Sequence, residues 1–447
     1  MPSRESSEDW SLYYAYGALG VQALLPIVIG SYASVKTPKW IRHRGKATKK
    51  EVILNPDDSD DEDDEEVEER IGLTDSLMFP VIASCMLLGL FLVFKYLDSK
   101  WINKILGGYF AFASVLAFQF TFTYLIKGAW SKFSSKPYTK YHFRLEQGYK
   151  QIMHIPLTAI SLVVIPFSIA LPIIYIFTDR PWYITNILSF SFAVSSISVL
   201  RLDGFKTGGA LLIGLFFYDI FWVFGTPVMV TVAKNLDAPI KVLAPRDLHN
   251  ADAGFSMLGL GDIVIPGIFV SLALRYDFSS YVRRTLKRNP DASPAAGDSY
   301  SKPYFLAVMV AYIAGLATTV AVMHIFEAAQ PALLYLSPAC IGAILLMGVL
   351  RGELPQLWQW SDDEEETEKG EQNKVTWAEA AKMDETPVVG DYARKANPVE
   401  GKPTASTEDQ ASPSVTASQD NEDWMNLEND KSENGKSKKK KASKKKK

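Results

Sequence analysis

The chain has 447 residues, of which 48% are hydrophobic and 22% charged, and its formal net charge is −3. Its mean hydropathy of +0.02 averages a very apolar middle with two very polar regions. This patterning argues against one soluble globular domain, and the charge balance gives no reason to expect a nucleic-acid partner.

Nine stretches are long and apolar enough to cross a bilayer, because a hydrocarbon core of about 30 Å needs about 20 helical residues. They must be helices, since lipid offers the backbone no hydrogen-bond partner and the stretches lack the alternation of a membrane barrel. We therefore predict an all-α polytopic membrane protein with nine transmembrane helices. The predicted spans are 11–34, 77–97, 104–126, 155–178, 182–200, 208–231, 255–275, 303–326 and 331–350.

Lys and Arg residues gather in alternate loops between these spans. The loops on one side are 36–70, 127–150, 201–206 and 275–302, and they hold eight, six, two and six of these residues. The loops on the other side hold at most three each. By the positive-inside rule, we predict an N-terminus outside the cytosol and a cytosolic C-terminal tail. The first span lacks a strongly basic n-region, so we interpret it as a retained anchor and not a cleaved signal peptide.

The first long polar segment contains the run DDSDDEDDEEVEE at 57–69. Such a run repels itself and stays solvated, so we predict that it is disordered. The two cysteines, Cys85 and Cys340, lie far apart in apolar spans and are expected to be free thiols, neither joined in a disulfide nor binding a metal.

Two aspartates lie within the predicted spans, Asp219 in GLFFYDIFWVF and Asp262 in MLGLGDIVIPG. An aspartate at the centre of a membrane helix costs roughly 2.5 to 3.5 kcal/mol on insertion scales, which makes a functional use the default hypothesis. The two spans are consecutive and must be antiparallel. If Pro227 marks the end of the first of these helices, the two carboxyls reach similar depth; if that helix continues to Val232, they do not.

A pair of carboxyls at one depth suits metal-free peptide hydrolysis. One ionised group can deprotonate water while the other, protonated, polarises the scissile carbonyl. Two nearby carboxyls in a low dielectric supply this state, because close like charges resist ionising together.

The residues around Asp262 are unusual for a plain spanning helix. Gly259 and Gly261 permit close backbone approach, by a packed helix or by a substrate, and Pro266 removes a donor one turn later. Secondary transporters also place proton- or ion-binding aspartates near broken helices, so a coupled transporter is the alternative hypothesis. We find no second copy of either aspartate segment, which a transporter built from repeats would show.

Three short motifs resemble those of the presenilin and signal peptide peptidase family. Tyr218 and Asp219 match its YD motif, and the segment Gly259-Leu260-Gly261-Asp262 matches its GxGD motif. The segment Pro331-Ala332-Leu333 matches its PAL motif. The three occur in the family's order, on the sixth, seventh and ninth predicted spans.

The resemblance implies a presenilin-like fold and an intramembrane aspartyl protease without cofactor or metal. Asp219 and Asp262 would be the catalytic pair, with Tyr218, Gly259, Leu260, Gly261, Pro331, Ala332 and Leu333 supporting the site or binding substrate. The implied substrates are type II-oriented transmembrane segments, including remnant signal peptides, in the endoplasmic reticulum membrane. Components of endoplasmic-reticulum-associated degradation and further copies of the chain are candidate partners. The predicted orientation and the short loop between the two aspartate spans favour the signal peptide peptidase branch over presenilins. The short N-terminus disfavours those relatives that have a large lumenal N-terminal domain.

The C-terminal region is rich in Ser, Thr, Pro and charge and ends in KKKKASKKKK, so no core can form there. Lys444 and Lys445 have the spacing of a cytosolic dilysine retrieval signal, although any basic tail attracted to anionic lipid has it too. The predicted organisation is a lumenal N-terminus at 1–10, N-terminal transmembrane helices at 11–178 with a disordered acidic cytosolic loop at 35–76, a catalytic transmembrane core at 182–350 and a disordered cytosolic tail at 351–447.

Overall fold

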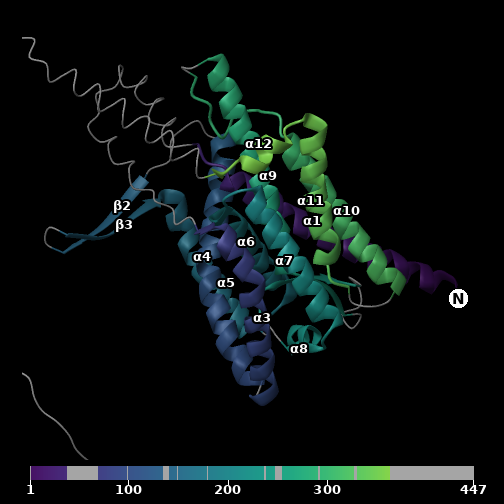
Figure 1. Ribbon diagram of the computed structural model, residues 1–447. Helices are drawn as coiled ribbons and strands as arrows, with labels where there is room; N and C mark the ends of the chain where they lie inside the picture. The colour runs from purple at the N-terminus through teal and green to yellow at the C-terminus, as the bar shows by residue number, and fades with distance from the viewer. Residues whose placement is uncertain are drawn as a thin grey trace, which may run out of the picture. The chain divides into compact units, whose positions relative to one another are not determined.

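The computed structural model describes most of the chain up to Asp362. The described residues are 2–37, 69–97, 99–133, 140–147, 150–178, 180–235, 238–246, 254–289, 292–326 and 330–362. Within these ranges, nine helices are long and apolar enough to cross a membrane, which confirms the prediction of a polytopic helical membrane protein (Figure 1). They are α1 (Pro2–Ser34), α3 (Leu73–Tyr96), α4 (Ser99–Phe133), α5 (Ala159–Phe177), α6 (Trp182–Val199), α7 (Phe205–Phe224), α9 (Leu260–Arg288), α10 (Pro303–Phe326) and α11 (Leu333–Arg351).

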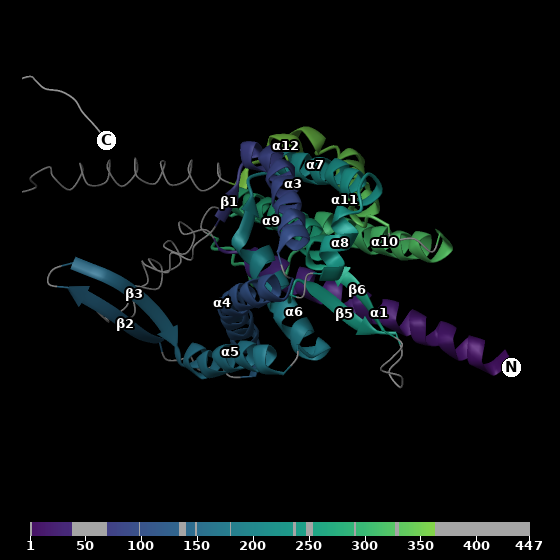
Figure 2. The same ribbon diagram turned by 90° about the horizontal axis from the view of Figure 1, so that it is seen from below.

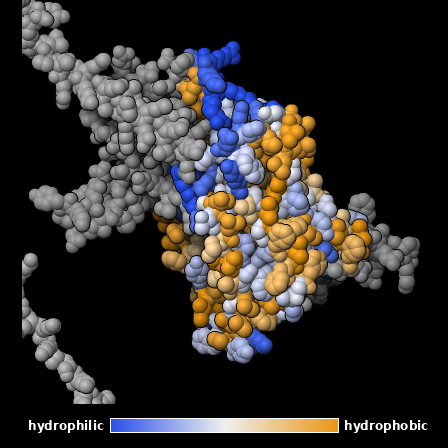
Figure 3. All heavy atoms as spheres, viewed as in Figure 1, coloured by the Kyte–Doolittle hydropathy of each residue, from blue (hydrophilic) through white to orange (hydrophobic). Residues whose placement is uncertain are grey.

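Large apolar side chains cover the outer faces of these helices. Ile105 and Phe112 of α4 are 69% and 73% exposed, and Phe177 of α5 is 84% exposed. Hydrophobic residues form broad patches on the face in Figure 3. Monomeric soluble proteins rarely expose contiguous apolar patches of this kind, whereas a bilayer covers them with lipid.

The most deeply buried of the nine helices is α9. It packs against α1, α6, α7, α10 and α11, and its residues from Pro266 to Ser279 are all buried. Figures 1 and 2 show it inside the group of helices. The helix that carries Asp262 is therefore shielded from lipid along most of its length.

Glycines bring α7 and α9 close together. A Cβ atom added at Gly208 of α7 would lie 2.7 Å from Cδ2 of Phe269 of α9, closer than real Cβ contacts. On the other side of α9, a Cβ added at Gly267 would lie 2.6 Å from Cδ1 of Ile197. Small residues of this kind let helix backbones approach, which is the usual basis of helix packing in membranes.

Three two-stranded sheets accompany the helices in the described part of the chain, and the sequence analysis predicted none of them. They are β1 (Glu69–Ile71) parallel to β4 (Leu200–Leu202), β2 (Lys140–Gln147) antiparallel to β3 (Lys150–Thr158), and β5 (Lys241–Pro245) antiparallel to β6 (Phe255–Gly259). In Figures 1 and 2 the β2–β3 hairpin projects away from the helices, while Figure 2 shows β5 and β6 beside α1.

Two predicted spans are wrong at their N-terminal ends, because these ends form strands and not helix. Residues 155–158 belong to β3, and residues 255–259 form β6, so Asp262 lies in the first turn of α9 and not deep within a helix. One edge of β6 finds its backbone hydrogen-bond partners in β5. Non-helical backbone at membrane depth is tolerated where it is buried in protein.

Other boundaries also differ from the prediction. The span predicted at 208–231 is divided, because α7 ends at Phe224 and a separate α8 (Val228–Asn235) follows Pro227. Proline lacks the N–H group that would continue the first helix. The helix that contains the first predicted span begins at Pro2 and not at residue 11.

Parts of the segments predicted to be disordered are ordered. Of the loop predicted at 35–76, Glu69–Ile71 forms β1 and α3 starts at Leu73. Of the tail predicted from 351, α12 (Leu354–Gln359) and the residues up to Asp362 pack on the protein. Trp360 anchors this segment, because its ring centroid lies 5.8 Å from that of Phe205 and 5.3 Å from that of Tyr276. The polar composition of the tail did not predict this contact. The predictions for residues 57–68 and for Lys444 and Lys445 lie outside the described residues.

Candidate active site

Asp219 lies on α7 and is only 4% exposed. Its Oδ2 accepts a hydrogen bond of 3.2 Å from the backbone N–H of Leu333. Leu333 is the first residue of α11, and the N–H groups of a helix's first turn have no partner within the helix. The carboxyl of α7 therefore meets the N-terminal end of α11, where the helix dipole favours negative charge.

Asp262 occupies the first turn of α9, three residues after the end of β6. Its side chain is half-buried, and one carboxyl oxygen would lie 3.3 Å from a Cβ atom added at Gly259. The hydroxyl of Tyr312 on α10 donates a hydrogen bond of 3.4 Å to the backbone carbonyl of Asp262. Strand β6 and helix α10 thus fix the turn that carries this carboxyl.

The two aspartates lie at the same depth along antiparallel helices. The rings of Phe205, at the start of α7, and Tyr276, within α9, are 5.5 Å apart, which sets the relative height of the two helices. Counted from these rings, Asp219 and Asp262 are each about 14 residues away, or about 21 Å at 1.5 Å per residue. These equal counts support the first of the two alternatives that the sequence left open, in which the two carboxyls reach similar depth.

The PAL residues are all buried beside Asp219. Ala332 and Leu333 are 7% and 5% exposed, Pro331 is also buried, and Ala332 is the N-cap of α11. Residues of all three motifs therefore belong to or pack against one apolar cluster, and the backbone of Leu333 in the third motif bonds directly to Asp219.

The remaining predicted residues have different surroundings. Tyr218 is half-buried and packs against two separate apolar clusters, one of which contains Trp222. Leu260 donates its N–H to the carbonyl of Ile240 at 2.9 Å, which joins α9 to the start of the β5 strand. Gly259 and Gly261 are exposed, so the backbone on either side of Leu260 is open to a ligand.

Within the described residues, His324 and the two cysteines make no hydrogen bond to Asp219 or Asp262. His324 is exposed at the end of α10, where its ring lies 6.5 Å from that of Tyr13. Cys85 is exposed and Cys340 is buried, and both are free, as predicted.

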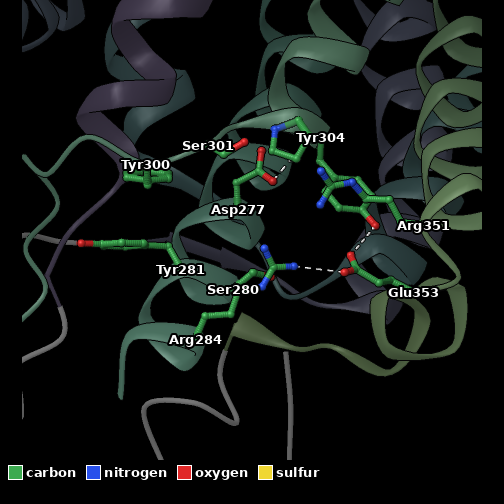
Figure 4. A pocket seen from close by; sticks show the side chains of 10 residues that line it. Asp277, Ser280, Tyr281, Arg284, Tyr300, Ser301, Tyr304, Arg351 and Glu353 are labelled. Atoms are coloured by element: carbon green, nitrogen blue, oxygen red, sulfur yellow. Dashed lines mark hydrogen bonds and ion pairs between the residues drawn. The ribbon is translucent and has the colours of Figure 1, made fainter. Parts of the chain in front are cut away.

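A cavity of about 280 Å³ lies at the opposite end of α9 (Figure 4). Within it, Asp277 accepts hydrogen bonds from the N–H groups of Tyr304 and Phe305 at the start of α10. Glu353 accepts one from the Tyr304 hydroxyl and pairs with Arg284 at 3.1 Å. Asp277 is about 15 residues, or about 22 Å, along α9 from Asp262. The polar groups of this cavity pair with one another and hold three helix ends together, so we assign it no part in the chemistry of the two aspartates.

Comparison with known proteins finds one family and consistent relatives. The family model described as signal peptide peptidase matches residues 62–364. The chain is 38% identical to a signal peptide peptidase from Mus musculus over 395 residues, which cover 85% of this chain and 92% of that protein. It is 38% identical to a signal peptide peptidase from Homo sapiens over 369 residues, covering 80% and 86%. Intramembrane protease 2 from Caenorhabditis elegans is 48% identical over 198 residues, covering 42% and 41%.

Among solved structures, the chain is similar to a presenilin family intramembrane aspartate protease. The TM-score is 0.40 and the identity 16%, and the match covers 73% of this chain and 96% of the other.

Proposed function

We propose, given that this chain belongs to the signal peptide peptidase family of intramembrane aspartic proteases, that Asp219 and Asp262 are its catalytic pair. The observation that carries the proposal is that Asp219 and Asp262 lie equally far along antiparallel helices from the contact of Phe205 with Tyr276, with the Leu333 N–H bonded to Asp219. Family membership does not favour the transporter alternative.

The reaction follows from the chemistry of two carboxyls that share one proton. The ionised group removes a proton from a water molecule, whose oxygen attacks the scissile carbonyl carbon. The protonated group gives its proton to the carbonyl oxygen, which forms a tetrahedral diol. The carboxyl that took the proton from water gives it to the leaving nitrogen. Collapse of the diol then breaks the C–N bond, and one of its hydroxyl protons returns to the other carboxyl, which restores the state with one shared proton. The hydrogen bond from the Leu333 N–H and the packing of the buried Leu333 side chain keep the Asp219 carboxyl oriented for these proton transfers.

The substrate segment must be extended at the cleavage point, because carbonyls in a helix are hydrogen-bonded and sterically shielded. Strand β6 supports this requirement, since it ends at Gly259, three residues before Asp262. An extended segment that adds to a sheet edge gains main-chain hydrogen bonds irrespective of its sequence. The exposed Gly259 and Gly261 leave room for its backbone, and the buried Pro331 and Ala332 directly precede Leu333, which bonds to Asp219.

We further propose type II-oriented transmembrane segments, including remnant signal peptides, as substrates, and the endoplasmic reticulum membrane as the location. The distribution of Lys and Arg supports a lumenal N-terminus and a cytosolic C-terminus. Degradation components of that membrane and further copies of this chain are the proposed partners.

The test uses the full chain purified in detergent, with a type II signal-peptide substrate. Wild type is expected to cleave, and Asp219→Ala and Asp262→Ala are each expected to lower turnover at least about 1,000-fold while remaining folded. Asp298→Ala, which removes an exposed carboxyl far from the pair in sequence, is the control and should retain activity. Full activity in either aspartate variant would remove that residue from the mechanism.

A further inference from the structure

The outer edge of β5 is closed by a side chain of α6. Asn186 donates from Nδ2 to the carbonyl of Leu243 at 2.7 Å, and its Oδ1 accepts the N–H of Leu243 at 2.8 Å. A neighbouring strand would make the same pair of bonds to Leu243. One turn further along α6, the buried Ser189 hydroxyl lies 3.0 Å from the carbonyl of Pro239 and 2.9 Å from that of Lys241. The α6 side chains therefore take the place of a third strand.

The pairing register shows which backbone groups of β6 are left open. Residues opposite each other in an antiparallel pair alternate between hydrogen-bonded and non-hydrogen-bonded pairs. Leu243 lies opposite Met257, and its N–H and carbonyl are directed to Asn186, so this pair is non-hydrogen-bonded. The next pair of the same kind is Lys241 with Gly259. The N–H and carbonyl groups of Met257 and Gly259 consequently point away from β5.

This open edge of β6 is accessible. Met257 is 57% exposed, Gly259 is also exposed, and within the described residues neither has a recorded hydrogen-bond partner on that side. On the buried side of the sheet, Val242 and Ala244 are 3% and 0% exposed. Because Asn186 closes the outer edge of β5, a further strand can be added only at the edge of β6. That edge leads directly into the turn that carries Asp262.

We propose that Asn186, assisted by Ser189, is a positioning residue that holds the β5–β6 hairpin against α6 and so sets which peptide bond of a paired segment faces the carboxyls. The inference rests on the proposed function and extends it to the choice of cleavage position. A two-stranded hairpin is marginally stable alone, so its position depends on what anchors it. If the paired segment shifts its register along the strand edge, only a shift of two residues keeps both the hydrogen bonds and the faces on which its side chains lie.

The test compares Asn186→Ala with wild type in the full chain, using a substrate that has one dominant cleavage site. We expect KM to rise about 10-fold, since two main-chain anchors are lost, and product ends about two residues away to increase. A merely structural role would lower the melting temperature or kcat and leave the product ends unchanged. Ser191→Ala is the matched control: Ser191 lies on the same helix and is fully buried, and its hydroxyl donates within α6, to the carbonyl of Ile187.

A second variant tests rescue by chemistry. A protonated carboxylic acid has one donor and one acceptor, as the amide of Asn186 does. The activity of Asn186→Asp relative to wild type at the same pH is therefore expected to rise as the pH falls, with product ends returning to the wild-type pattern. Hydrogen exchange at the Leu243 amide should be faster in Asn186→Ala and unchanged in Ser191→Ala.

The outcomes separate the two proposals. Cleavage by wild type, with the same KM and product ends in Asn186→Ala, overturns the role of Asn186 and leaves the proposed function intact. Absence of cleavage by well-folded wild type overturns the proposed function and this inference with it.

Discussion

The backbone N–H of Leu333 donates to the Asp219 carboxyl across 114 positions of sequence. Helix α11 therefore begins at the carboxyl that α7 carries, and the start of α11 is held by a buried side chain, because Leu333 is only 5% exposed. Further along, a Cβ added at Gly315 of α10 would lie 3.1 Å from Leu336, so α10 also packs closely on α11. The geometry at Asp219 consequently depends on the packing of apolar side chains such as Leu333 and Leu336 as well as on the hydrogen bond itself.

Leu333→Ala tests this dependence, since it keeps the N–H donor and removes the packing. A buried Leu→Ala change costs about 2–5 kcal/mol, so we expect a lower melting temperature. The loosened bond to Asp219 should also lower kcat about 10-fold. Leu346→Ala on the same helix is the control, because Leu346 is 60% exposed and faces outward. Wild-type turnover in Leu333→Ala would show that the position of α11 does not matter for the reaction.

Two adjacent glycines of α7 offer a matched comparison. A Cβ at Gly208 would lie 2.7 Å from the ring of Phe269, whereas a Cβ at Gly209 would meet nothing within 4 Å. Gly208→Ala should push α7 from α9, cost about 1–3 kcal/mol and reduce cleavage. Gly209→Ala should be neutral or slightly stabilising, since alanine is the better helix former. Thermal unfolding and turnover of both variants check this, and equal behaviour of the two would contradict the close approach of the helices.

The ion pair between Arg275 and Asp362 joins α9 to the segment after α12. The Arg275 guanidinium is 2.6 Å from Asp362, and the two side chains are 4% and 22% exposed. Asp362→Ala leaves a buried cation without its carboxylate, so we expect a loss of about 2 kcal/mol and a melting temperature lower by several degrees. Asp362→Asn keeps an oxygen acceptor and should lose less. Melting temperatures of both variants equal to wild type would show that this segment contributes nothing to stability.

Asp203, between β4 and α7, gives a pH-dependent prediction. Burial raises the pKa of its carboxyl; Arg70 and Arg275 oppose this shift, while Asp362 and Asp75 add to it. An acid whose pKa is raised on folding binds its proton more tightly in the folded state. Its contribution to stability is therefore full below the ordinary value of 3.8 and is lost as the pH rises through the folded value.

Asp203→Asn has no carboxyl to ionise, so it does not lose this stability as the pH rises. We expect its melting temperature to exceed that of wild type by about 1 °C at pH 7 and the difference to shrink as the pH is lowered towards 4. Thermal unfolding of both proteins across this pH range is the measurement. A difference that stays constant with pH would contradict the assignment to Asp203.

The sequence alone determined the helical membrane class and the pair of aspartates to examine. Apolar length specifies spanning helices because lipid leaves the backbone no alternative, and a carboxyl such as Asp219 stands out against that background. The motif order then predicted the family, which the comparisons confirmed. These conclusions depend on local composition and spacing, which a sequence displays directly.

Only the tertiary structure decided how the site is assembled. The strand character of residues 255–259 depends on pairing with β5, and the order of residues 353–362 depends on where Trp360 packs; neither follows from local composition. The bond from Leu333 to Asp219 joins α11 to α7, and the closure of β5 by Asn186 joins that strand to α6; in both cases the partners are far apart in the chain. In each of these bonds one partner is a backbone group, which every residue carries, so the residue types alone do not predict which backbone group a side chain will meet.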